Sequence, residues 1–270
     1  MSPEEIMESA IRNYKPIKVF ALFSSGNDSL VSTHFAMSHG ADEVLLCNTG
    51  FGIRESREHW FATCCQHQWN CRMLFPPGKS YREFVLKYGF PGPAAHRYAY
   101  VWLKERALLK VIRETKRQRT DRVMLVTGVR NQESARRMGF VEPILRRGAA
   151  VWVAPMQSFS ALDVTNYIEE HKLTRSPVAA LIHKSGECMC GAFAEGDRNK
   201  DSELRELELW FPEMAAEIKA LQKEAEAAGV HAKWGHRPPK PNLTKELPFM
   251  PLCIGCEANQ DTEVKIEPSM

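Results

Sequence analysis

Short apolar segments alternate with longer amphipathic segments through the first two thirds of the chain. The apolar segments predict β-strands over residues 19–23, 43–48, 71–75, 122–128 and 150–155. Between them, apolar positions recur at helical spacing and predict helices over residues 28–39, 54–69, 81–88, 99–116 and 161–171. Strands that alternate with helices indicate the α/β class, here a Rossmann-like parallel sheet with helices on both faces. Ligands of such sheets bind at the carboxyl ends of the strands.

The pattern changes in the last third of the chain. Residues 201–228 are rich in strong helix formers, with an interruption at Pro212 and a stop at Gly229. The segment that follows is rich in proline and predicts irregular structure. We therefore divide the chain into an α/β domain over residues 1–195 and a helical, irregular and cysteine-bearing C-terminal region over residues 196–270.

Length and composition are those of a globular protein, since 44% of the 270 residues are hydrophobic and 26% are charged. No apolar segment approaches the roughly 18 residues that span a bilayer. The first residues, MSPEEIMESAIRNYK, lack the basic start and apolar core of a signal peptide. We therefore expect a cytoplasmic protein that does not associate with membranes.

Basic residues concentrate in the middle of the chain, although the net charge is only +3. Residues 104–122 hold eight basic and three acidic side chains. Further arginines follow at positions 130, 136, 137, 146 and 147. This distribution indicates an anionic ligand, either the phosphates of a nucleotide or a nucleic acid. For residues 116–119 the alternative is a solvated basic helix face.

Small and polar residues in the stretch SSGNDS separate the first predicted strand from the first predicted helix. A strand, a loop and a helix N-terminus present free backbone N–H groups, which bind phosphate oxygens well. Gly26 allows close approach of the backbone, while Ser24, Ser25 and Ser29 can add hydroxyl donors. Asp28 can cap the helix or help to hold Mg²⁺. The alternative is an ordinary capped turn, because neither G-x-x-x-x-G-K-[ST] nor G-x-G-x-x-G occurs.

The SSGNDS loop resembles the S-G-G-x-D-S pyrophosphate loop of the adenine nucleotide alpha-hydrolase-like enzymes, the PP-loop ATP pyrophosphatases. Within that group, the chain is similar to the phosphoadenosine phosphosulfate (PAPS) reductase-like family. CNTGFGIRES resembles its D-T-G segment, with Asn48 in place of Asp, and HRYAYVWLKERAL resembles an R-[FW]-C-x-x-x-x-L-K pattern, with Ala99 in place of Cys. GVRNQESARR matches G-x-R-x-x-E-S-x-x-R, and PMQSFSALDVTNYIEEHKLTRSPV resembles the segment that closes the domain. The resemblance covers residues 15–192.

The resemblance implies a site for ATP, with cleavage between its α and β phosphates and Mg²⁺ to neutralise charge. It implies nucleotide binding by Ser24, Ser25, Gly26, Asp28, Ser29, Thr49, Gly128, Arg130, Ser134 and Arg137. Asp28, Lys104 and Arg130 are the residues expected to act in catalysis. Lys104 would contact a phosphate, the alternative being a lysine that faces solvent. Glu133 would pair with an arginine and so fix the loop.

The eight cysteines fall into groups. Cys64, Cys65 and Cys71 lie in one predicted helix and strand, where we expect them to serve packing. Four others form two close pairs, namely Cys188 with Cys190 and Cys253 with Cys256. Four thiolates can ligate one centre, either a 4Fe-4S cluster, which we favour, or a structural Zn²⁺. The alternative is four unrelated thiols.

PAPS reductases carry a nucleophilic cysteine in an E-C-G-x-H segment, and no such segment occurs in this sequence. We therefore expect an ATP pyrophosphatase that adenylates its substrate, similar to the sulfurtransferases of this superfamily. One alternative is a sulfonucleotide reductase that binds PAPS or adenylyl sulfate and draws electrons from a cluster or a partner. Another is a non-catalytic module that binds a nucleotide or nucleic acid. The expected partners are an adenine nucleotide, tRNA or DNA as substrate, a sulfur or electron donor protein, and a second copy in a homodimer.

Overall fold

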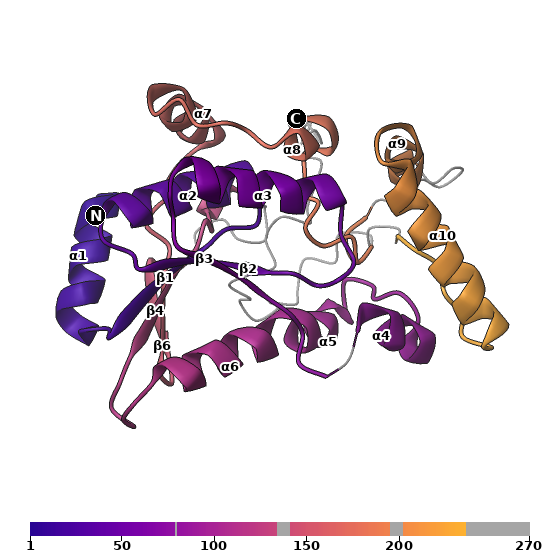
Figure 1. The fold of residues 1–270 in the computed structure, drawn as a ribbon, viewed down its shortest axis with the longest axis horizontal. Helices are drawn as coiled ribbons and strands as arrows, with labels where there is room; N and C mark the ends of the chain where they lie inside the picture. The colour runs from indigo at the N-terminus through magenta and orange to yellow at the C-terminus, as the bar shows by residue number, and fades with distance from the viewer. Residues whose placement is uncertain (79, 134–140, 195–201, 236–270) are drawn as a thin grey trace, which may run out of the picture.

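A twisted sheet forms the centre of the structure, a computed structural model that describes residues 1–78, 80–133, 141–194 and 202–235 (Figure 1). The described part holds one 6-stranded sheet in the order β3-β2-β1-β4-β6-β5. Its strands are β1 (Lys18–Leu22), β2 (Glu43–Cys47), β3 (Cys71–Leu74), β4 (Val123–Val126), β5 (Ile144–Arg147) and β6 (Ala150–Val153). All pairs are parallel except β5 with β6. The five strands predicted from the sequence are confirmed, and β5 is an additional edge strand.

The helices follow the alternating order that the sequence predicts. Those of the α/β part are α1 (Pro3–Tyr14), α2 (Asn27–Ser38), α3 (Arg54–Gln66), α4 (Tyr81–Tyr88), α5 (His96–Tyr100), the π-helix η1 (Val101–Glu105), α6 (Arg106–Thr115), the 3₁₀-helix η2 (Asn131–Glu133), α7 (Ala161–Glu170) and α8 (Pro177–Ile182). Further along lie α9 (Ser202–Trp210) and α10 (Pro212–Ala227). The sequence analysis missed α1 and α8, although a Ser2–Glu5 capping box marks the start of α1.

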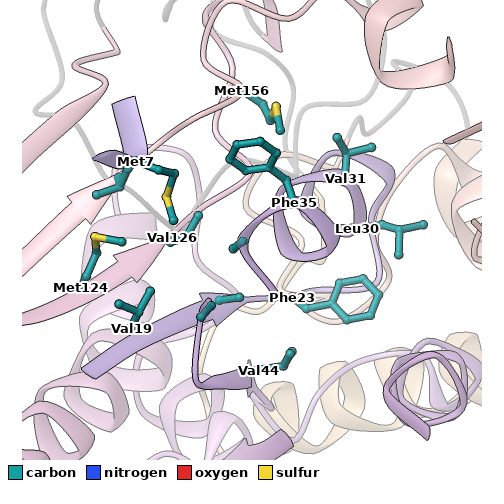
Figure 2. Packing of buried hydrophobic residues seen from close by; sticks show 14 of the residues in the cluster. Met7, Val19, Phe23, Leu30, Val31, Phe35, Val44, Met124, Val126 and Met156 are labelled. Carbon is teal, nitrogen blue, oxygen red and sulfur yellow. The ribbon is translucent and has the colours of Figure 1, made fainter. Parts of the chain in front are cut away.

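Helices cover both faces of the sheet, as the parallel pattern requires (Figure 1). On one face, α1, α2, α3 and α7 pack on alternate residues of the strands, such as Val19 and Ala21 of β1. Figure 2 shows Phe23, Leu30 and Phe35 within this core. On the other face, α6 packs its apolar side on the intervening strand residues. Because successive side chains of a strand point to opposite faces, both faces demand apolar residues, and the strands therefore read as continuous apolar segments.

A further core lies beyond the sheet and joins α4 to α9, α10 and the cysteine-bearing segment after α8. Phe84 of α4, Phe211 just before α10, Ile218 of α10 and Trp234 are buried there together. This packing brings the described C-terminal residues against the α/β part (Figure 1). Residues 236–270, with Cys253 and Cys256, lie outside the described residues. Within the described residues, no helix combines the length and apolar character needed to cross a membrane.

Three histidines from separate elements meet on the α2, α3 and α7 side. The ring of His34 lies 4.9 Å from that of His171 and 5.7 Å from that of His67. Its Nδ1 lies 2.9 Å from the Tyr167 hydroxyl oxygen. Burial, followed by the neighbouring His171 and His67, lowers the pKa of His34 from 6.5 to about 4. The folded protein therefore disfavours the proton that the unfolded chain accepts.

We expect the free energy of unfolding to fall as the pH drops from 6.5 toward 4, because the unfolded chain protonates His34 before the folded chain does. Urea unfolding at several pH values measures this dependence. His34→Gln keeps a partner for Tyr167 but cannot titrate, so its unfolding should depend less steeply on pH. Equal slopes for the variant and the native protein would show that His34 does not contribute.

Candidate nucleotide site and cysteine segment

Three loops meet at the carboxyl ends of β1, β2 and β4. They are the SSGNDS loop between β1 and α2, the loop of residues 48–53 after β2, and residues 127–130 after β4. This convergence follows from the strand order, in which β1 lies between β2 and β4. Eight of the eleven residues predicted to bind the nucleotide or to act in catalysis lie on these loops or on the first turn of α2. Ser134 and Arg137, and the side chain of Glu133, lie outside the described residues.

Hydrogen bonds between serines close the SSGNDS loop. The backbone N–H of Ser24 donates to Ser29 Oγ at 3.2 Å, and the two hydroxyl oxygens lie 3.0 Å apart. Ser29 Oγ in turn donates to the carbonyl of Gly26 at 2.9 Å. Gly26 is the N-cap of α2 and provides no capping side chain. The first turn of α2 therefore presents its backbone N–H groups at the sheet edge without a side-chain cap.

Ser25 occupies a left-handed backbone conformation, with φ of 66°. Such a conformation costs about 1 kcal/mol or more in a residue other than glycine and persists only where the surroundings hold it. Here the Ser25 hydroxyl is buried and donates to the carbonyl of Ser56 on α3 at 2.7 Å. The buried hydroxyl of Ser25 thus fixes the loop to α3.

Gly128 is required by the close approach of β4 to α2. A Cβ atom at this position would lie 2.6 Å from the carbonyl carbon of Asp28 and 2.7 Å from the backbone nitrogen of Ser29. These are backbone atoms of a helix N-terminus, which cannot move aside as a flexible side chain could. The absence of a side chain at Gly128 therefore sets the distance between the two loops.

Asp28 pairs with Arg130 across this contact. Arg130 Nε lies 3.0 Å from Asp28 Oδ1, and Arg130 Nη1 donates to the carbonyl of Phe159 at 3.1 Å. Burial raises the pKa of Asp28, while Arg130 acts in the opposite direction. The expectation that Asp28 caps α2 is wrong, since Gly26 is the N-cap and Asp28 faces Arg130 instead. The pair places a guanidinium at the start of α2.

Lys104 points into the protein from the π-helix η1. Its Nζ donates to Glu187 Oε2 at 2.6 Å, and the two side chains are only 13% and 4% exposed. The alternative of a lysine that faces solvent is therefore wrong. Burial, followed by Glu187, raises the pKa of Cys47 to about 12, although Lys104 lowers it. The Cys47 thiol thus stays protonated beside this ion pair.

The segment of residues 185–190 runs against the loop that follows β2. The backbone N–H of Ile53 donates to Gly186 at 2.8 Å, and that of Met189 donates to Phe51 at 2.9 Å. A Cβ atom on Gly52 would lie 2.2 Å from the Glu187 carbonyl oxygen, so glycine is required there too. The sequence analysis missed Glu187, because no local pattern connects it with Lys104.

Hydroxyl groups of this loop and of α3 add to this contact. Ser56 Oγ donates to the carbonyl of Ser185 at 2.6 Å, and Thr49 Oγ1 donates to that of Glu187 at 3.4 Å. Thr49, a predicted nucleotide ligand, is buried in this role. Backbone and side-chain bonds together thus fasten the segment that carries Cys188 and Cys190 to the sheet edge.

Cys188 is half-buried and Cys190 is buried, and both line a small pocket. Lys184, Glu203 and Trp234 also line this pocket. The Tyr81 hydroxyl donates to the carbonyl of Cys190, and Trp234 Nε1 to that of Met189, each at 2.8 Å. The backbone on which the two thiols stand is therefore held by aromatic side chains.

Two soft thiols on one firmly held segment fit half of a four-thiolate centre. The other two predicted ligands, Cys253 and Cys256, lie outside the described residues. Among the described residues, no three or more His, Cys, Asp or Glu side chains are grouped to hold a metal ion. The structure thus fixes the position of Cys188 and Cys190 without completing a metal site.

The other cysteines behave differently from one another. Cys64 is buried in the core and Cys71 packs against it, as predicted. Cys65, expected to serve packing as well, is exposed on α3, and for this residue the prediction is wrong. Consecutive helix positions face about 100° apart, so the two neighbours cannot share one buried stripe.

A parallel sheet with a strand–loop–helix turn at its carboxyl edge is the architecture of the adenine nucleotide alpha-hydrolase-like class. The family model of the phosphoadenosine phosphosulfate reductase domain matches residues 18–185, more than half of the chain. The chain therefore belongs to the phosphoadenosine phosphosulfate reductase domain family. No curated protein sequence matches the chain.

Solved structures share the fold at low sequence identity. A phosphoadenylyl-sulfate (PAPS) reductase from Candida auris, in its phosphate complex, is 16% identical with a TM-score of 0.50, over 67% of this chain and 85% of its own. The U34-tRNA thiolase NcsA from Methanococcus maripaludis, with its 4Fe-4S cluster, is 12% identical with a TM-score of 0.39, over 83% of this chain and 80% of its own. The similarity to the reductase concerns the fold.

We expect Gly128→Ala to lower the free energy of unfolding by about 1–3 kcal/mol, because its methyl group overlaps the backbone of Asp28 and Ser29. Gly26→Ala is the matched control. Its Cβ would lie 3.4 Å from Ser185 Cβ, an ordinary contact, and its φ of −81° suits alanine. Urea unfolding of both variants tests the difference. Equal stability of the two variants would contradict the close approach of Gly128 to the backbone of Asp28 and Ser29.

Proposed function

We propose that this protein binds ATP at the carboxyl edge of the sheet and uses it to adenylate a substrate. The observation that carries the proposal is the N-terminus of α2, which opens at Gly26 without a capping side chain and lies beside Arg130. Backbone N–H groups and the helix dipole favour phosphate at such a position. The guanidinium of Arg130 adds a forked donor for a second phosphate oxygen.

Different residues would have different roles when ATP is cleaved between its α and β phosphates. The SSGNDS loop and the start of α2 would hold the leaving pyrophosphate and stabilise the charge that develops on it. Arg130 would orient the phosphate chain, while Asp28 holds Arg130 in place. Asp28 also offers carboxylate oxygens of the kind that Mg²⁺ prefers, and Mg²⁺ would supply further neutralisation of charge. An oxygen of the substrate would attack the α phosphate, and sulfide or another nucleophile would then displace AMP.

We propose further that Cys188 and Cys190, together with Cys253 and Cys256, ligate a 4Fe-4S cluster, with Zn²⁺ as the alternative. The support is the firm attachment of residues 185–190 to the loop after β2, which places two thiols next to the proposed nucleotide site. Such a cluster supplies either structural support or redox and sulfur chemistry. Ligation by four thiolates leaves no open position on the metal, which favours the structural or redox role.

A second candidate is a sulfonucleotide reductase. It is favoured by the family to which residues 18–185 belong, whose description names phosphoadenosine phosphosulfate. PAPS carries phosphates that the same loop and Arg130 could bind. Electrons would then have to come from a cluster or from the thiols of a partner, because the sequence has no E-C-G-x-H segment.

We expect the protein to convert Mg-ATP to AMP and pyrophosphate, and Arg130→Lys to weaken ATP binding by about tenfold or more. Lysine keeps the positive charge beside Asp28, so the fold should persist, but it lacks the forked donor of arginine. Calorimetric titration measures the affinity, and chromatography identifies the products. Arg12→Lys, a matched change in an exposed residue of α1, is the control. Tight binding of PAPS without turnover of ATP would favour the reductase instead.

We expect anaerobically purified protein to contain iron and acid-labile sulfide and to absorb visible light. Cys188→Ser should remove the iron, the sulfide and the absorbance, because each ligand of a four-thiolate centre is needed. Cys65→Ser, a change at an exposed thiol outside the proposed centre, should leave all three unchanged. A colourless protein with stoichiometric zinc, lost in the same variant, would replace the cluster by a zinc site.

A further inference from the structure

An exposed and a partly buried aromatic side chain, each with a cation beside its ring, meet where α4 lies against η1. The rings of Tyr88 and Trp102 are 6.3 Å apart and nearly perpendicular. Lys87 Nζ lies 5.1 Å from the centre of the Tyr88 ring, and the Arg106 guanidinium carbon lies 5.4 Å from that of Trp102. Tyr88 is 56% exposed, which is high for a large aromatic side chain.

Packing from beneath holds this aromatic pair in place. The buried ring of Phe84 lies 5.8 Å from that of Trp102 and 5.3 Å from that of Tyr88. The π-helix also matters, because its extra residue per turn changes which side chains face inward. Within this one turn Lys104 is buried against Glu187, whereas Trp102 remains partly exposed. The rings are therefore already positioned before any ligand binds.

The same outer surface continues in both directions along α5 and α6. Tyr98 precedes Trp102 by four residues and is 72% exposed, while Arg113 follows in α6 and is exposed as well. At 1.5 Å per residue, the helix from Tyr98 to Arg113 extends about 22 Å. The opposite side of α6 packs on the sheet, so this side is the one left to solvent.

Basic side chains outnumber acidic ones along this surface. Four basic side chains are exposed on the helix, namely Arg97, Arg106, Lys110 and Arg113. The acidic side chains of the same stretch are Glu105, which is partly buried, and Glu114, whose Oε1 lies 3.8 Å from Lys110 Nζ. We name Lys87, Tyr88, Tyr98, Trp102, Arg106 and Arg113 the aromatic–basic face. Cations that alternate with exposed rings suit a ligand with both phosphates and flat bases.

We propose that the aromatic–basic face binds an unpaired segment of RNA. Each base that stacks on an aromatic ring contributes about 1–3 kcal/mol, and the cations neutralise phosphates between the bases. Duplex nucleic acid does not fit this chemistry, because its bases are stacked on one another and offer no free faces. Folded RNA supplies unpaired bases in its loops and ends, where aromatic and arginine side chains stack on them. An acidic protein would use the cations but leave the exposed rings of Tyr88 and Tyr98 without a specific role.

The inference goes beyond the proposed function, since the face lies on the outer side of the helix whose inner side holds Lys104. Binding of RNA there requires neither ATP nor a metal centre. A failure to bind RNA would thus leave ATP turnover untouched, and a failure to cleave ATP would leave RNA binding untouched.

Fluorescence anisotropy with a labelled oligouridine of about 12 nucleotides tests the proposal. Tyr98→Ala and Tyr88→Ala should each weaken binding by about fivefold or more, since each removes a stacking ring. Arg113→Gln should remove one phosphate contact and so reduce the slope of log affinity against log salt concentration by about 1. Phe61→Ala and Arg12→Gln, which change exposed residues on the α3 and α1 side, should bind as the native protein does.

Unchanged ATP affinity and circular dichroism of the two tyrosine variants would show that they are folded. The proposal is overturned if these folded variants bind oligouridine as tightly as the native protein. It is overturned equally if an RNA duplex of the same length, or the DNA strand of the same sequence, binds more tightly than the unpaired RNA.

Discussion

The buried ion pair of Lys104 and Glu187 joins the helix η1 to the segment that holds Cys188 and Cys190. Lys104 comes from a helix beneath the sheet, and Glu187 from a segment that the chain reaches only after β6, α7 and α8. Both side chains are almost fully withdrawn from water, so each charge depends on the other and on neighbouring polar groups for its solvation. Loss of one partner from such a pair typically costs about 3–5 kcal/mol, because the other charge remains buried.

The backbone around this ion pair explains why two distant stretches of sequence behave as one structural unit. The loop after β2 has a glycine at Gly52, where the carbonyl of Glu187 leaves no room for a side chain. The hydroxyl of Ser25 reaches Ser56, and the hydroxyl of Ser56 reaches Ser185. A chain of hydrogen bonds therefore leads from the SSGNDS loop to the segment that holds Cys188.

Elements defined by local pattern could be predicted from the sequence, whereas contacts between distant residues could not. The central strands were predictable because both faces are buried and the apolar segments are unbroken. The strand β5 was not, since Arg146 and Arg147 at its end are exposed and it pairs only at an edge. Of the two roles considered for Asp28, capping was suggested because a carboxylate near a helix start often caps it, and the sequence does not show that Arg130 lies opposite. Glu187 gave no signal, because its partner lies 83 residues away.

The thiols near the sheet edge illustrate how position rather than residue type decides chemistry. Cys47 at the end of β2 lies near enough to the buried ion pair for both charges to act on it, yet its environment raises its pKa to about 12, so it cannot serve as a thiolate at neutral pH. Cys188 lies one residue from Glu187 but is partly exposed, beside a pocket that extends to Lys184. Burial, with Glu187 as the second cause, keeps the first thiol protonated, whereas the second stands on the segment of Glu187 and lines the pocket. Position therefore assigns the Cys47 thiol to the packing of the sheet, and it sets the Cys188 thiol at the pocket.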